Sequence, residues 1–149
     1  MKGLVLFSAA VLISVQAQAL TLKEKKQFQE WQDYLKNKSS SYVETVKTKC
    51  GFELPVTIDE KMTTPFMAAN ANAASYCDSV RSVISGMCDD ATSKTAIKGA
   101  VKKVSCVLGK KADDVVLSLD KKSGVITFSV GVSGSNLDEK VKTYLENNL

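Results

Sequence analysis

Four cysteines carry the most distinctive chemistry in this 149-residue chain: Cys50, Cys77, Cys88 and Cys106. Thiols can bind a metal, exchange electrons or form structural disulfides, and their spacing separates these roles. The sequence has no C-x-x-C pair and no histidine, whereas zinc sites and thioredoxin-like sites bring their ligands or thiols together in close pairs. The pattern therefore predicts two structural disulfides, with no metal site and no cofactor.

The N-terminal residues predict export, which would place these thiols in an oxidising compartment. Lys2 precedes an almost unbroken apolar run, Gly3 to Val15, and Ala17-Gln18-Ala19 resembles a signal-peptidase cleavage site. The run is shorter than a membrane-spanning helix requires. We expect residues 1–19 to be a cleaved signal peptide and 20–149 to form a single disulfide-stapled domain, periplasmic or secreted, without a membrane span. The alternative is an N-terminal membrane anchor.

The spacing of Cys77 and Cys88 restricts the disulfide pairing. Both lie in an apolar pattern of helical period, and 11 residues of helix separate two α-carbons by about 16 Å, against the roughly 7 Å that a disulfide allows. A bond between these two is therefore excluded if the segment is helical. Two pairings remain: 50–88 with 77–106, or 50–77 with 88–106. The next helix is expected to run back antiparallel and return Cys106 to the level of Cys77, which favours the first pairing.

Residues suited to catalysis are sparse. Without histidine the usual general base near neutral pH is missing, so Ser-His-Asp and Cys-His mechanisms are excluded. Adjacent acids occur at Asp59-Glu60, Asp89-Asp90 and Asp113-Asp114, in positions typical of helix caps and turns. A protein without catalytic activity is therefore predicted. The alternative is a carboxylate-dependent hydrolase of envelope polymers that pairs Asp59 or Glu60 with an acid from a distant segment across a cleft.

Lysine pairs are the strongest candidates for binding. Lys102-Lys103 precedes a predicted strand and Lys121-Lys122 lies in a predicted hairpin, so these four lysines are expected at one end of the sheet. They would form a docking rim for an anionic surface, although solubility and protection of the sheet edge also explain them. The net charge is only +4 and Arg81 is the one arginine, so nucleic-acid binding is not expected.

Helical periodicity covers the first two-thirds of the predicted domain. Apolar spacing predicts one helix over about 22–49, or two helices with a joint near Ser39-Ser40-Ser41. Residues 52–62 contain a proline among β-branched residues and predict an extended connection or an edge strand. Thr63-Thr64-Pro65 predicts a threonine cap and the start of a helix that continues to Cys88. A further helix is expected over about 93–103.

The apolar period changes from 3.6 to 2 after residue 103. Three alternating runs centre on Cys106, Leu117 and Phe128, and residues 120–124 between the last two predict a hairpin loop. A C-terminal helix is expected from residue 137. The predicted fold is α+β, with N-terminal helices and the C-terminal helix packed on one face of a small three-stranded antiparallel meander. Its outward face would carry Ser105, Val107, Val116, Ser118, Thr127, Ser129 and Gly131.

Together these features predict a small exported binding protein. Its partner is expected to be a protein or an anionic component of the cell envelope, and an inhibitor or immunity-type protein is one version of this prediction. A structural or assembly protein that pairs through its sheet is a further alternative, because the outward face of small hydroxyl residues and valines suits packing against another protein or copy.

Overall fold

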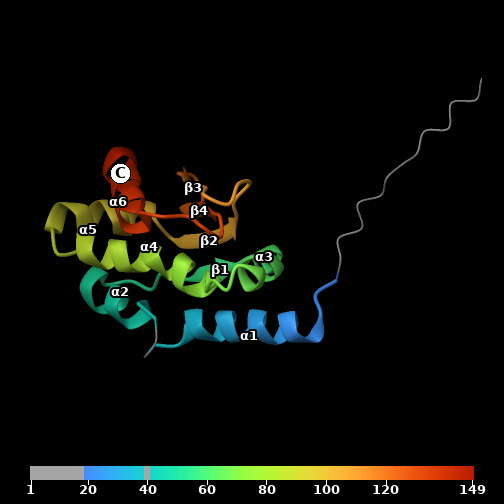
Figure 1. The fold of residues 1–149 in the computed structure, drawn as a ribbon. Helices are drawn as coiled ribbons and strands as arrows, with labels where there is room; N and C mark the ends of the chain where they lie inside the picture. The colour runs from blue at the N-terminus through green and yellow to red at the C-terminus, as the bar shows by residue number, and fades with distance from the viewer. Residues whose placement is uncertain (1–18, 39–40) are drawn as a thin grey trace, which may run out of the picture.

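The computed structural model describes residues 19–38 and 41–149, so residues 1–18 of the predicted signal peptide lie outside the described part. Within these ranges the chain forms six α-helices, one short 3-10 helix and a four-stranded sheet (Figure 1). The helices are α1 (Leu22–Lys36), α2 (Val43–Cys50), η1 (Glu60–Met62), α3 (Thr63–Ala68), α4 (Ala73–Met87), α5 (Ala91–Ala100) and α6 (Leu137–Asn148). The strands are β1 (Val56–Ile58), β2 (Lys103–Leu108), β3 (Val115–Asp120) and β4 (Val125–Val130).

The α+β class is confirmed, but the three-stranded antiparallel meander is wrong. The strand order is β1-β2-β4-β3, with β2 parallel to both β1 and β4, and only β3 and β4 antiparallel. The predicted hairpin between β3 and β4 is present, and the expected edge strand within residues 52–62 is β1. Strand β4 lies between β2 and β3, and its inward side chains are more deeply buried than those of β3. Ile126, Phe128 and Val130 are fully buried, whereas Val115, Leu117 and Leu119 of β3 are half-buried.

A loop over residues 109–114 carries the chain from β2 to β3 across the end of β4. The loop is held there by a hydrogen bond of 2.8 Å that Ser133 N donates to Ala112 O. A Cβ at Gly131 would collide with the backbone carbonyls of Lys111 and Ala112, so only glycine admits this close crossing. Gly131 was predicted on the outward face of the sheet and is instead buried beneath this loop. The crossing leaves room for β4 between β2 and β3.

The predicted helix over residues 63–88 is divided at Asn70. This residue has a φ of 53°, and Ala71 N donates to Phe66 O at 2.8 Å, a Schellman pattern that ends α3. Asn72 then caps α4 through its side chain. The break follows from asparagine chemistry, because asparagine tolerates the left-handed conformation and is a strong helix cap. The segment from 73 to 87 remains one continuous helix, as the argument about the cysteines requires.

Other helix limits also differ from the sequence expectation. The first helical segment forms two helices, and its joint lies partly outside the described residues, at Ser39 and Ser40. The helix expected over 93–103 spans Ala91–Ala100, because the Asp90 side chain caps it by accepting from Ser93 N at 2.7 Å. Thr63 begins α3 and does not cap it.

Both disulfides have the favoured pairing, which is thereby confirmed. Cys50–Cys88 joins α2 to the end of α4, and Cys77–Cys106 joins α4 to β2, with Cα–Cα distances of 5.2 and 5.8 Å. The chain has no free cysteine, so no thiolate remains to ligate a metal. Disulfide-bonded domains are typical of oxidising compartments.

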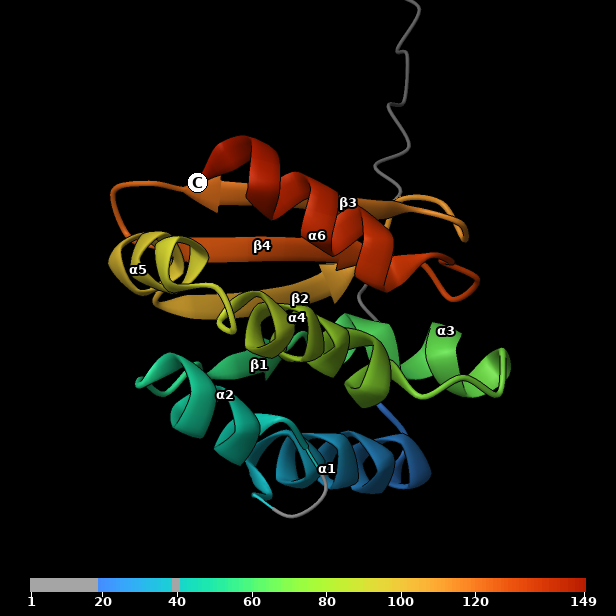
Figure 2. The ribbon, with the colours of Figure 1, turned by 90° about the vertical axis from the view of Figure 1, so that its left-hand side faces the viewer.

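The helices are not all placed on one face of the sheet. In Figure 2, α4 and α6 lie in front of the strands, and α4 packs against α6, α2 and α1. Helix α1 lies instead beyond β1, on the side away from β2, and contacts β1 and α3 (Figure 2). The expectation that the N-terminal helices share one sheet face is therefore wrong for α1. This arrangement separates α1 from β3 by the full width of the sheet.

Arg81 joins these helices through a buried ionic network. Its side chain is 3% exposed, donates to Asp78 Oδ1 at 3.0 Å, and donates to the backbone carbonyls of Leu35 and Leu54 at 2.8 Å each. Asp78 Oδ2 accepts from Tyr42 N at 3.0 Å. Burial lowers the pKa of Arg81, and the hydrogen bond with Asp78 opposes this effect. One guanidinium therefore connects α4 to the end of α1 and to the segment before β1.

Candidate functional site

The four predicted binding lysines, which we call the lysine cluster, lie at one end of the sheet. Lys102 N donates to Gly124 O at 2.8 Å and Lys103 is in register with Val125, so the two pairs come from neighbouring strands. Asp120 lies in the same hairpin. Its pKa is lowered mainly by the hydrogen bond from the Ser123 hydroxyl, so its negative charge offsets part of this cluster. The backbone register thus sets the four residues at the same end of the sheet, while the Lys102 ammonium donates to Lys98 O at 2.8 Å. That the four lysines form a binding rim stays a prediction.

The acid pairs serve largely as caps and turn residues. Asp59 caps η1 by accepting from Lys61 N at 2.9 Å, and Asp114 accepts from Lys111 N at 2.9 Å. Glu60 lines a cavity of about 910 Å³ between α1 and α3, and no second acid is among the described residues that line it. The opposing acids that the hydrolase alternative requires of Asp59 or Glu60 are therefore not placed there.

A second cavity, of about 920 Å³, gathers acids from the α4–α5 junction and from α6. Asp89 pairs with Lys49 at 3.0 Å, and Glu146 pairs with Lys142 at 3.8 Å. The pKa of Asp90 is lowered by hydrogen bonds from Ser93, mainly from its backbone N–H. Glycoside hydrolysis needs one acid with a raised pKa that can donate a proton, whereas the pKa of Asp90 is lowered.

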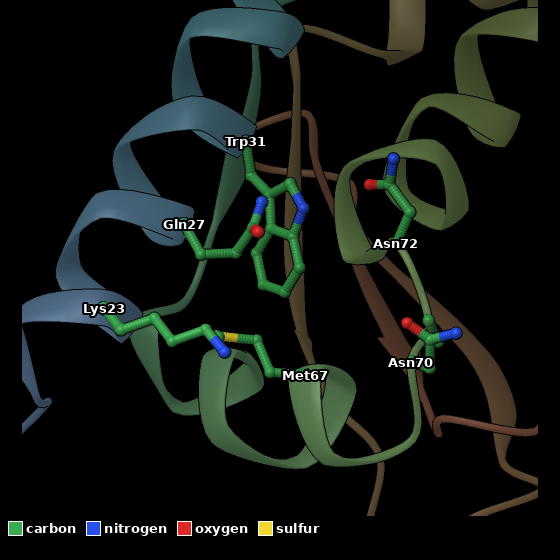
Figure 3. Close-up of a pocket in the computed structure, with 7 residues that line it drawn as sticks. Lys23, Gln27, Trp31, Met67, Asn70 and Asn72 are labelled. Carbon is green, nitrogen blue, oxygen red and sulfur yellow. The ribbon is translucent and has the colours of Figure 1, made fainter.

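A pocket between α1 and the α3–α4 connection has a different composition. We call it the α1 pocket, and its volume is about 360 Å³. Figure 3 shows Lys23, Gln27 and Trp31 extending from α1 toward the connection. The opposite side carries Met67, Asn70, Ala71 and Asn72.

Local structure fixes both walls of the α1 pocket. Lys23, Gln27 and Trp31 lie four residues apart, so they form one line along α1. On the opposite wall, the Schellman motif fixes the backbone conformation of Asn70. Asn72 is the N-cap of α4, and its Oδ1 accepts a hydrogen bond from Ser75 N at 3.3 Å. That bond leaves the Asn72 amide nitrogen without a partner among the described residues. Local structure therefore fixes the backbone of this wall, while its polar groups remain free to bind.

The electrostatics of the α1 pocket favour a ligand rich in acceptors. Lys23 supplies the one charge in its lining, and no acid is among the described lining residues. In the described part of the chain, neither the Lys23 ammonium nor the side-chain amides of Gln27 and Asn70 have a hydrogen-bond partner. Trp31, which is 5% exposed, adds an aromatic surface beside Met67. A carboxylate with nearby hydroxyl or amide groups would complement this set.

Sequence reasoning missed this pocket. Trp31 is a buried residue of the core, and no role was expected for Lys23, Gln27, Asn70 or Asn72. The sequence did contain a usable signal. Lys23, Gln27 and Trp31 recur at intervals of four residues, so they lie on the same face of a helix. The two asparagines of the α3–α4 break are the other signal.

Comparison of the chain with protein-family models, with curated proteins and with solved structures found no match. Among the residues that the structure describes, no helix has the length and apolar character needed to cross a membrane. In the same ranges, no group of three or more cysteine, aspartate or glutamate side chains is placed to hold a metal ion.

Proposed function

We propose that the protein is an exported, non-catalytic binding protein that recognises a carboxylate-bearing sugar of the cell envelope in the α1 pocket. The observation that carries this proposal is the lining of the pocket: one lysine, three side-chain amides, an indole edge and no acid. Such a set complements a ligand with one negative charge and several hydrogen-bonding groups.

The apolar part of the lining supports a sugar more than a simple anion. Sugars present C–H faces as well as hydroxyl groups, and the ring of Trp31 together with Met67 offers an apolar contact beside the amides. The pocket volume of about 360 Å³ is at the lower end of the range for small-molecule sites. Because capping interactions fix the backbone that carries Asn70 and Asn72, little backbone ordering would oppose binding on that wall.

The predicted export supports an envelope ligand. A chain with a signal peptide and two disulfides would work where envelope polymers are accessible, and recognition requires none of the catalytic groups that the sequence lacks. The lysine cluster is a second candidate for the anionic ligand, supported by the backbone register of β2 with β4, although the Lys102 ammonium already donates to Lys98 O at 2.8 Å.

The test uses Trp31, the only tryptophan of the chain, as a reporter inside the pocket. Purified, oxidised protein is titrated with N-acetylmuramic acid and with N-acetylglucosamine, which lacks the lactyl carboxylate. We expect the muramic acid to shift the Trp31 indole resonance and quench its fluorescence with millimolar affinity. The neutral sugar should bind about tenfold more weakly, because a charged hydrogen bond contributes about 1.5 kcal/mol or more.

The variant Lys23→Gln should remove this difference between the two sugars, whereas Lys26→Gln, an exposed lysine on the same helix, should keep it. Lys102→Gln/Lys122→Gln tests the lysine cluster and should leave the titration unchanged. The proposal fails if neither sugar changes the Trp31 signals, or if Lys23→Gln binds both sugars as the unmodified protein does. A loss confined to the Lys102/Lys122 variant would assign anion binding to the cluster.

A further inference from the structure

The two edges of the sheet are protected very differently. Strand β1 spans only three residues, follows Pro55 and is flanked by α1, and each of these features blocks the addition of another strand. Strand β3 spans six residues and pairs only with β4. Its other edge has no strand beside it in the described part of the chain, and it contains no proline. An edge of this length is a ready template for strand pairing.

Apolar surface accompanies the free edge of β3. The inward side chains Val115, Leu117 and Leu119 remain half-buried, although their neighbours on β4 are fully buried. Val116, on the opposite face, is 55% exposed. A cavity of about 630 Å³ lies between β3 and α6, lined in part by Val115 and Tyr144. A further strand beside β3 would cover these side chains on both faces of the sheet.

The charges at the ends of β3 complement each other when the strand is reversed. Asp113-Asp114 directly precedes the strand, and Lys121-Lys122 directly follows it. Two copies of β3 placed antiparallel would bring Asp113-Asp114 of each copy to the end of the other that carries Lys121-Lys122, although Asp120 also lies at that end. Two parallel copies would set like charges together. A two-fold axis at Leu117 aligns Asp113 of each copy with Lys121 of the other, and it also sets Asp114 opposite the second copy's Asp120.

From these observations we propose that β3 is the interface of a homodimer, in which two copies pair antiparallel and form one continuous eight-stranded sheet. The half-buried side chains of Val115, Leu117 and Leu119 in one copy then pack against those of the other. Asp113 of each copy also pairs with Lys121 of the other. The interface shares no residue with the α1 pocket, whose lining comes from α1, α3 and the α3–α4 connection, and α1 itself lies beyond β1, away from β3 (Figure 2). Both pockets of the dimer therefore stay open.

Sedimentation velocity over a concentration series measures the dimer, which we expect to form at micromolar protein. Asp113→Lys and Lys121→Glu each turn two attractive contacts into repulsive ones, because the interface is symmetric. Each should weaken dimerisation about tenfold or more. An equimolar mixture of the two variants should restore it, since every contact between unlike copies again joins opposite charges. Neither side chain has a hydrogen-bond or ion-pair partner among the described residues, so the fold should be unaffected.

The control Lys26→Glu reverses an exposed charge on α1 and should leave dimerisation unchanged. A protein that stays monomeric up to about 1 mM overturns the proposal. So does a dimer that neither reversal weakens, which would place its interface elsewhere. A mixture of the two variants that associates no better than either alone contradicts the antiparallel pairing.

Discussion

Replacing Arg81 with methionine is expected to lower the free energy of unfolding by about 3–5 kcal/mol, because the change leaves Asp78 as a buried, uncompensated charge. The carbonyls of Leu35 and Leu54 also lose their donor. A small domain has a net stability of about 5–15 kcal/mol, so this variant would be close to unfolding. Urea denaturation of the oxidised protein measures the change.

The conservative variant Arg81→Lys separates geometry from charge. A lysine keeps the positive charge, but its single ammonium group cannot donate to Leu35 O, Leu54 O and Asp78 Oδ1 at once. Arg81→Lys should therefore still lower the free energy of unfolding. The double variant Arg81→Met/Asp78→Asn should cost at least about 1 kcal/mol less than the sum of the two single changes. Additive costs, or a loss below about 1 kcal/mol for Arg81→Met, would contradict the network.

Removal of the Cys77–Cys106 bond has the second large expected effect. The two residues are 29 positions apart, and the loop-entropy model gives a contribution of about 3–4 kcal/mol for a loop of this size. The double variant Cys77→Ala/Cys106→Ala should lose about this much in urea unfolding. Cys50→Ala/Cys88→Ala should lose a similar amount, because its loop spans 38 positions.

Thiol titration provides the control for this comparison. The unmodified protein should show no free thiol in denaturant without reductant, and each double variant should also show none, since its other disulfide stays intact. A disulfide variant that unfolds at the same urea concentration as the unmodified protein would contradict the stabilising role. Free thiol in the unmodified protein would contradict the pairing itself.

Local patterns in the sequence were sufficient to predict most individual elements. Helix geometry excluded a bond between Cys77 and Cys88, and the expected antiparallel return of the next helix then favoured the pairing that the structure has. The β3–β4 hairpin followed from alternation around residues 120–124. Strand order was not predictable in this way, since it depends on a loop that crosses the end of β4, and that crossing depends on the space left by Gly131.

The candidate site was less accessible to sequence reasoning than the fold. The lysine cluster was predicted because both lysine pairs flank strands, and the parallel pairing of β2 with β4 still brings them to one end. The lining of the α1 pocket comes from residues 23–31 and from residues 67–72, so no local sequence pattern shows the pocket. The amides of Asn70 and Asn72 line the pocket because the helix breaks at Asn70. The sequence did not predict this break, because the apolar period continues from α3 into α4.

The order of the two disulfides along the chain has a consequence for proteolysis. Cys77 lies inside the loop closed by Cys50–Cys88, and Cys88 lies inside the loop closed by Cys77–Cys106, so the two loops overlap. A protease that hydrolyses any one peptide bond between residues 50 and 106 therefore releases no fragment, because at least one bridge spans every such cut. A chain cut once in this range would migrate as a single species on a non-reducing gel and separate into two fragments only after reduction.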